Sequence, residues 1–542
     1  MKKTLLFFLL ISSSFVFSQE EALVFFADKE NVAASIANPI TILSQEALDR
    51  KSAQGIEIDE RDVPLNEAYK AQINSIAGIT VLAKSKWLNA VYVRGPYAAI
   101  DNLSNLSFVT EVEFMDKSLN RTFPRIAPRD KFEIENQRRV DYNYGSAYNQ
   151  TDMIGVDQLH QSGFDGDGIV VAFMDNGYPN VLSNPAYAHI RNEGRLLGYY
   201  DFVERIENPN GSGSHGAATL SDAAAILENP NPDLAFVGTA PKASYYLFVT
   251  EDGYGESPVE EAYWVEALER ADSLGVYVTN TSLGYQDFDN PAYNHLYEDL
   301  DGFTTIGARG SNAAFDKGMI NVTSAGNDGN GFGYIGSPAD APGSFTIGAV
   351  DSSGDYVDFS SYGPNSAGVV KPDVMAQGRS SAIVNQYGQV DYSNGTSFSS
   401  PIIAGAVASL WQAVPNLKND VVMQAIRESA DLYNNPTYNM GYGIPDFGDA
   451  LNALLQMSAE QHLQETLFAL YPNPVSSEVH ISFPKSVNHA EFLLYNVLGE
   501  RVKQAKISPL KNSLDVSELP SGMYIASITS NNKTTSFKII KE

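Results

Sequence analysis

Histidine is the side chain best suited to move protons near neutral pH, and this chain has seven of them. One of these, His215, follows the glycine- and serine-rich stretch 211–214 and precedes a helical pattern over residues 217–227. Glycines let a backbone or a ligand approach closely, and the start of a helix would fix the position of the imidazole ring. A lone histidine is more often structural than catalytic, so His215 by itself is only a candidate base.

A serine lies at the start of a second predicted helix. Ser397 stands within the segment 394–401 and is followed by the small and apolar residues 402–408, which favour a tightly packed interior helix. At a helix N-terminus, free backbone N–H groups and the positive end of the helix dipole favour a developing anion. Ser397 is therefore a candidate nucleophile, and the equal alternative is that it only caps the helix.

Two further polar side chains follow apolar runs that predict buried strands. Asp175 comes directly after the run 169–174, and Asn327 comes shortly after the run 320–324. Ligands of an open α/β sheet bind beyond the carboxyl ends of its strands. A carboxylate there could orient an imidazole, and an amide could donate to an oxyanion. Aspartate and asparagine are also common turn residues, so a simple turn is the alternative at both positions.

The elements that would position these side chains alternate between strand and helix from Gly168 onward. Residues 257–274 carry apolar side chains at helical spacing. Continuous apolar runs, typical of parallel strands buried on both faces, occur at 169–174, 244–249, 276–279, 320–324 and 344–350. This alternation predicts an α/β fold with a doubly wound, mostly parallel sheet and helices on both faces.

The regions on either side of the α/β segment have a different character. Residues 89–115 have the pattern strand, helix, strand, which predicts a small α+β unit. Residues 118–150 are rich in arginine and lack periodicity, which predicts an exposed linker. Residues 468–542 hold strand-length segments separated by turn residues, which predicts a small all-β sandwich.

Composition excludes several classes of function. The formal charge of −29 argues against a nucleic-acid partner, because such proteins need a basic surface. The chain has no cysteine, so disulfides, thiol proteases and cysteine-ligated metals are excluded. At the N-terminus, Lys2 and Lys3 precede the apolar run 5–11, and the small residue Ser18 is suited to cleavage. This pattern predicts a secretory signal peptide over residues 1–18.

Taken together, these segments resemble the motifs of the subtilisin-like serine peptidases, the subtilases. The resemblance covers residues 150–457, and its aspartate, histidine, oxyanion and serine motifs are matched by the segments 175–177, 215–217, 325–327 and 395–401. The order acid, base, nucleophile along the chain is also that of the family. Asn176, Ala217 and Phe398 replace commoner residues of these motifs, but none of the three positions holds a proton-transfer group.

The resemblance implies a catalytic triad in which His215 takes the proton of Ser397 while Asp175 orients the imidazole. It also implies that Asn327 holds the oxyanion. The substrate would be a protein or peptide, the enzyme would be a monomer, and the chemistry would need no cofactor or metal, although structural Ca²⁺ would fit the family. The resemblance further implies a substrate-lining set formed by Ser282, Leu283, Gly284, Ser324, Ala325 and Gly326.

The flanking regions resemble other parts of secreted subtilases. Residues 19–125 resemble an inhibitory propeptide, residues 126–149 would be a linker or processing zone, and residues 150–457 would be the peptidase domain. Residues 468–542 resemble the C-terminal sorting domain of type IX secretion, through the segments 471–474, 495–499 and 519–524. This resemblance implies that the secretion machinery is a partner. It also implies passage through the periplasm and outer membrane, followed by release or attachment to the cell surface.

Two other functions are alternatives to a secreted serine endopeptidase. A catalytically inactive subtilase fold could serve as a surface-binding module, but that function predicts the loss of at least one of four key residues, and all four are present. An adhesin carried by residues 458–542 is the second alternative. That tail is short and matches a sorting signal, so adhesion would have to reside on the α/β segment.

Overall fold

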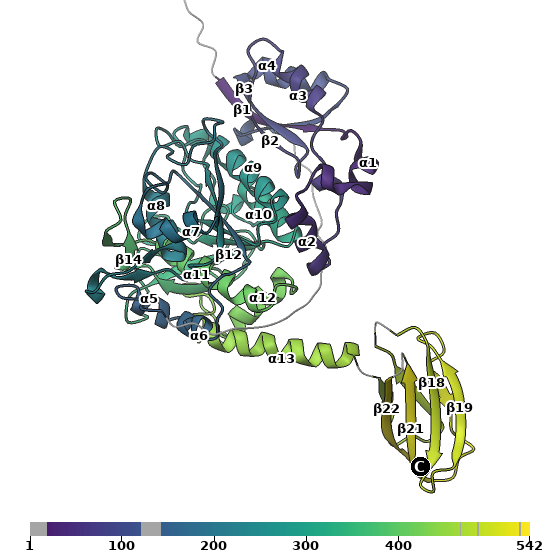
Figure 1. Ribbon diagram of the computed structural model, residues 1–542. Coiled ribbons are helices and arrows are strands. Elements are labelled where there is room, and N and C mark those ends of the chain that lie inside the picture. The colour runs from purple at the N-terminus through teal and green to yellow at the C-terminus, as the bar shows by residue number, and fades with distance from the viewer. Residues whose placement is uncertain (1–18, 121–141, 467, 485–486, 531–532) are drawn as a thin grey trace, which may run out of the picture. The chain divides into compact units, whose positions relative to one another are not determined.

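The computed structural model describes residues 19–120, 142–466, 468–484, 487–530 and 533–542 (Figure 1). The predicted signal peptide and most of the predicted linker lie outside these residues. The chain divides into two units, one ending at Asn452 and one beginning at Ala453. Within the described ranges, no helix combines the length and the apolar character that crossing a membrane requires.

A seven-stranded parallel sheet lies at the centre of the first unit, with the strand order β13-β12-β11-β10-β5-β9-β6. The strands are β5 (Val170–Asp175), β6 (Leu196–Asp201), β9 (Ser244–Val249), β10 (Val278–Thr281), β11 (Ile320–Ser324), β12 (Ser344–Val350) and β13 (Val374–Gln377). The five runs that the sequence singles out are all strands of this sheet. The two terminal strands, β6 and β13, carry no continuous apolar run of comparable length, and the sequence patterns do not identify them.

Helices pack against this sheet in two pairs, α9 with α10 and α8 with α11. Nearly every side chain of α11 is buried, because the helix crosses β10, β11 and β12. The helices of this α/β part are α5 (Tyr148–Asp152), α6 (Val156–Gln161), α7 (Ala188–Asn192), α8 (His215–Ala224), α9 (Val259–Ser273), α10 (Ile306–Asp316), α11 (Thr396–Ala413) and α12 (Asn419–Glu428). The boundary between the two units falls within α13 (Phe447–Thr466). The predicted doubly wound fold is confirmed.

The first unit also contains a four-stranded antiparallel sheet with the order β2-β3-β1-β4. Alternate side chains of β1 serve two cores: Ala22 and Val24 pack within this α+β part, whereas Leu23 and Phe25 share a core with Trp264 of α9. Its elements are β1 (Gln19–Phe26), α1 (Val32–Ala37), α2 (Gln45–Gln54), α3 (Glu67–Asn74), β2 (Thr80–Ser85), β3 (Ala90–Pro96), α4 (Tyr97–Asp101) and β4 (Val109–Phe114). The sheet therefore rests on the α/β part.

The second unit carries two antiparallel sheets, one of three strands (β16-β17-β20) and one of four (β19-β18-β21-β22). Apolar side chains from both sheets, such as Ile481 and Phe492, share one core, as the predicted sandwich requires. The strands are β16 (Ala469–Tyr471), β17 (Glu478–Ser482), β18 (Ala490–Asn496), β19 (Arg501–Ile507), β20 (Ser513–Asp515), β21 (Gly522–Ser530) and β22 (Lys533–Lys541). The predicted all-β unit is confirmed.

Candidate active site

The carboxylate of Asp175 and the imidazole of His215 form the centre of the candidate site. Asp175 is the last residue of β5 and is fully buried, and His215 is the first residue of α8. The His215 Nδ1 atom lies 2.8 Å from Oδ1 and 3.0 Å from Oδ2 of Asp175. The Thr219 hydroxyl, one turn into α8, donates to Oδ2 at 3.2 Å, and the Asn176 N–H donates to Oδ1 at 2.8 Å. The carboxylate is thus held by four contacts.

Ser397 lies at the N-terminal end of α11, close to the imidazole. Its neighbour Phe398 packs its ring 5.8 Å, centroid to centroid, from the ring of His215. The Ser397 hydroxyl donates to the Ser282 carbonyl at 3.4 Å, a distance at the limit of a hydrogen bond. The N-cap of α11 is Gly395 and has no side-chain cap, and Ser397 is the second residue of the helix. The alternative that Ser397 caps this helix is therefore wrong.

Asn327 follows β11 and reaches the same helix end. Its Oδ1 atom accepts hydrogen bonds from the Thr396 N–H at 2.9 Å and from the Thr396 hydroxyl at 3.1 Å. Because the oxygen is held by the residue that precedes Ser397, the NH₂ end of the amide is the end left to donate to a ligand. Asn327 itself is exposed, as a group that meets a ligand must be.

The two predicted substrate-lining segments flank the end of α11. Ser282 follows β10 and donates its hydroxyl to the Ser397 carbonyl at 2.9 Å, while Leu283 is half-buried and Gly284 is exposed. Ser324 and Ala325, at the end of β11, are buried. The next residue, Gly326, exchanges hydrogen bonds with the hydroxyl of Thr396: its N–H donates at 3.2 Å and its carbonyl accepts at 3.1 Å. The structure therefore brings all of the predicted site residues to one edge of the sheet.

Two threonines support the site without standing out in the sequence. Thr396 holds both Asn327 and Gly326, and Thr219 holds the carboxylate of Asp175. Thr396 precedes the candidate nucleophile directly, and this position could have suggested its role. Thr219 could have been found only by its spacing, one helical turn after His215, which places both side chains on one face of α8.

The charges around His215 favour its protonated form. Attraction by the Asp175 carboxylate, which outweighs burial, raises the pKa of His215 above its ordinary value. Glu251 adds to this field, although burial raises the pKa of its own carboxyl to about 8. Burial likewise raises the pKa of Glu260 to about 9. Glu260 lines a cavity of about 410 Å³, together with Asp252 and Tyr254.

Metal ligands are not gathered at this site. In the parts of the chain that the structure describes, no group of three or more histidine, aspartate or glutamate side chains could hold a metal ion. The site's groups are instead an imidazole, a hydroxyl, a carboxylate and an amide. This set suits proton transfer and nucleophilic attack on a carbonyl. Independence from cofactors stays a prediction.

Three family models match the chain. The model described as "Subtilase family" matches residues 166–444. The model described as "Peptidase S8 propeptide domain, Bacteroidota" matches residues 21–132, and that described as "Secretion system C-terminal sorting domain" matches residues 469–542. The matched segments follow one another in the order propeptide, peptidase, sorting domain.

Known proteins are similar to this chain over part of its length. Subtilisin NAT from Bacillus subtilis subsp. natto is 28% identical over 325 residues, which are 58% of this chain and 73% of that protein. Subtilisin Savinase from Lederbergia lenta is 29% identical over 274 residues, which are 50% of this chain and 86% of that protein.

Proposed function

The chain belongs to the subtilase family, and from this premise we propose that it is a serine endopeptidase that hydrolyses peptide bonds in proteins. The observation that carries the proposal is the contact of His215 Nδ1 with the Asp175 carboxylate at 2.8 Å. This contact directs the other ring nitrogen, Nε2, away from the acid. The helix end that bears Ser397 lies beside the ring. A nucleophile in this position could use Nε2 as its base.

In the proposed reaction, Nε2 of His215 takes the proton of the Ser397 hydroxyl as the oxygen attacks the scissile carbonyl. The imidazolium that forms is stabilised by the buried Asp175 carboxylate, which remains ionised. His215 then gives the proton to the leaving amine, and an acyl-enzyme on Ser397 remains. A water molecule, deprotonated by the same imidazole, attacks the ester and releases the second product.

The oxyanion that develops on the carbonyl needs donors that are already in place. The N–H of Ser397 lies in the first turn of α11, where backbone N–H groups have no partner within the helix. The NH₂ group of Asn327 is the second donor, and Thr396 holds its amide in position. Donors fixed in this way stabilise the transition state without the cost of reorganising during the reaction.

The flanking domains set where and when the proposed peptidase acts. The C-terminal sorting domain indicates export by type IX secretion and an extracellular or cell-surface location. The N-terminal propeptide domain packs on α9 and α10 of the peptidase domain. We propose that it inhibits the enzyme until it leaves.

The proposal is tested against its two alternatives by expressing the full-length chain, purifying the processed protein and measuring its hydrolysis of casein. An inactive binding module or an adhesin would release no peptides. The matched control is Ser397→Ala, which should fold normally, as judged by circular dichroism and melting temperature, and should release no peptides. Turnover by this variant close to that of the parent would exclude Ser397 as the nucleophile.

A further inference from the structure

A segment of the propeptide domain reaches beyond its sheet to the ends of two peptidase helices. The chain between β1 and α3 contains α2 and the short 3-10 helix η2 (Glu60–Asp62). We call residues 44–62 the anchor segment. Its first backbone N–H, that of Ser44, donates to the carbonyl of Ser273 at the end of α9, at 3.0 Å. The same segment also reaches the end of α10, which is Asp316.

Glycines allow the close approach at both helix ends. Gly275 follows α9 with φ +82°, and Gly318 follows α10 with φ +84°. A Cβ atom at Gly275 would lie 2.8 Å from the backbone carbon of Glu46, and one at Gly318 would lie 2.7 Å from the side-chain oxygen of Gln54. A side chain at Gly275 would displace the backbone of the anchor segment, and one at Gly318 would displace the end of the Gln54 side chain, so the surface of the two helix ends fits this segment closely.

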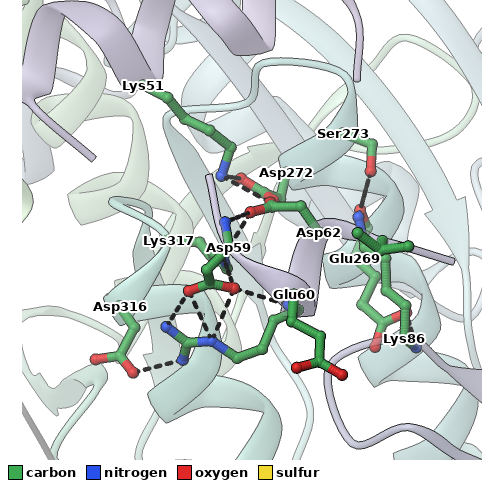
Figure 2. Close-up of polar contacts among 12 residues, drawn as sticks. Lys51, Asp59, Glu60, Asp62, Lys86, Glu269, Asp272, Ser273, Asp316 and Lys317 are labelled. Carbon is green, nitrogen blue, oxygen red and sulfur yellow. Dashed lines mark hydrogen bonds and ion pairs between the residues drawn. The ribbon is translucent and has the colours of Figure 1, made fainter. Parts of the chain in front are cut away.

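Two cations of α2 meet one anion of the peptidase domain. The Arg50 guanidinium lies 2.5 Å from Oδ1 of Asp272. The Lys51 ammonium lies 2.7 Å from the same atom, as Figure 2 shows. Arg50 also donates to the carbonyl of Lys317 at 2.9 Å. The side chains of Arg50, Lys51 and Asp272 are at most 1% exposed. Burial alone would raise the pKa of Asp272, but attraction by Lys51 and Arg50 lowers it to about 2.

The polarity is reversed at the neighbouring helix end. Lys317 of the peptidase domain lies 2.8 Å from Oδ1 of Asp59 and 2.7 Å from Oδ2 of Asp62, both in the anchor segment (Figure 2). The Lys317 side chain is 1% exposed. At the edge of the cluster, Arg61 pairs with Asp316 at 2.8 Å. Each domain therefore contributes both a buried anion and a buried cation to the contact.

Charges arranged in this way select one partner in one register. A buried charge that loses its partner is strongly destabilising, so a shifted or foreign segment would leave Asp272 and Lys317 uncompensated. These contacts lie at the C-terminal ends of α9 and α10. The candidate catalytic groups come from other ends, namely the end of β5 and the starts of α8 and α11. The anchor segment can therefore hold the domain without itself filling the site.

We propose that the anchor segment is a second docking element, specified by charge, that keeps the propeptide domain bound after the chain between the domains has been cut. The proposal rests on the proposed function only in that the retained domain blocks a peptidase. The partner of the helix-end surface is this segment of the chain's own propeptide domain.

The test measures release without using catalysis. A full-length Ser397→Ala chain, which should not digest itself, receives a recognition sequence for a site-specific protease within residues 121–141. After the cut, dissociation of the N-terminal fragment is followed by dilution and size-exclusion chromatography. We expect Asp272→Asn to speed dissociation ~30-fold or more and Lys51→Gln to speed it at least ~10-fold. The double variant should dissociate no faster than Asp272→Asn alone, because the two groups interact.

The matched control is Lys70→Gln, since Lys70 pairs with Glu67 within the propeptide domain and both are partly exposed. Its dissociation rate should equal that of the parent. Parent-like rates for Lys51→Gln and Asp272→Asn would overturn the proposal, and so would effects that simply add in the double variant. A lower yield of folded protein with an unchanged dissociation rate would make the segment a folding aid and would also overturn it. None of these outcomes depends on whether Ser397 is a nucleophile.

Discussion

The imidazole Nδ1 of His215 lies 2.8 Å from Oδ1 of Asp175, across 40 residues of sequence. The acid is fully buried at the end of β5, and the base is half-buried at the start of α8. Three donors surround this buried carboxylate, namely the imidazole Nδ1, the Asn176 N–H and the Thr219 hydroxyl. Asp175 therefore fixes the tautomer of the His215 imidazole and exerts a strong electric field on it.

The pH dependence of hydrolysis should report the pKa of His215, which Asp175 raises above its ordinary value. A general base must be neutral, so kcat/KM is low below this pKa and rises as the pH passes through it. We expect the acid limb of kcat/KM to lie above the usual histidine value of about 6.5. The profile is measured with a small peptide substrate whose own charge does not change with pH.

The matched variant for this profile is Asp175→Asn, which keeps the shape and removes the charge. Its rate should fall by about 10⁴-fold, and the acid limb of the remaining activity should move to lower pH. An acid limb in the parent at or below the usual histidine value would contradict the argument.

Asn327→Ala should lower kcat by about 100- to 1,000-fold and leave KM nearly unchanged, because an oxyanion donor acts mainly in the transition state. Steady-state kinetics of the purified variant give both constants. A raised KM with an unchanged kcat would instead indicate a role in binding or folding.

Thr396→Val tests how much the hydrogen bond that positions the Asn327 amide contributes to kcat. It removes the hydroxyl that donates to Asn327 at 3.1 Å but leaves the backbone N–H that donates at 2.9 Å. We expect a smaller fall in kcat than for Asn327→Ala, with the same small effect on KM, and a combined variant that is no worse than Asn327→Ala alone.

Phe398→Met should make the enzyme more sensitive to peroxide. Phe398 is 5% exposed, and its ring lies 5.8 Å from that of His215. Oxidation of a methionine at this position to the sulfoxide would place a polar group, larger than the unoxidised side chain, beside the candidate base and nucleophile. Residual activity after equal peroxide exposure compares the two proteins, and equal losses would show that oxidation at the other methionines dominates.

The sorting domain should be dispensable for activity. Its core consists of residues from Phe468 onward, so a chain ending at Met457 removes that core completely. We expect the shortened chain to hydrolyse casein at the parental rate when it is produced without export. It should not be released by cells that secrete the full-length protein. A folded but inactive shortened chain would contradict this expectation.

The local elements, and the chemistry at their ends, follow from the order of residues along the chain. The runs 244–249, 320–324 and 344–350 coincide with β9, β11 and β12, because a strand buried on both faces is rich in apolar side chains and carries no charged ones. Asp175, His215 and Ser397 each stand at the end of a predicted element. Parallel strands and the helices that follow them bring such ends to one edge of the sheet, so the candidate site follows from the order of the elements.

Contacts between surfaces that are distant in sequence depend on the three-dimensional fold. In the sequence, ordinary charged residues of an exposed helix and turn are all that is apparent at Arg50, Lys51 and Asp62. Asp272 and Lys317 likewise resemble the polar residues found at the ends of two other helices. Their burial depends on partners more than 200 residues away, as the separation of Lys51 and Asp272 shows. The spacing of charged residues along the chain does not indicate which distant residue will be the partner. Which charges pair is therefore set by the fit of two surfaces that are distant in sequence, which is a property of the tertiary fold.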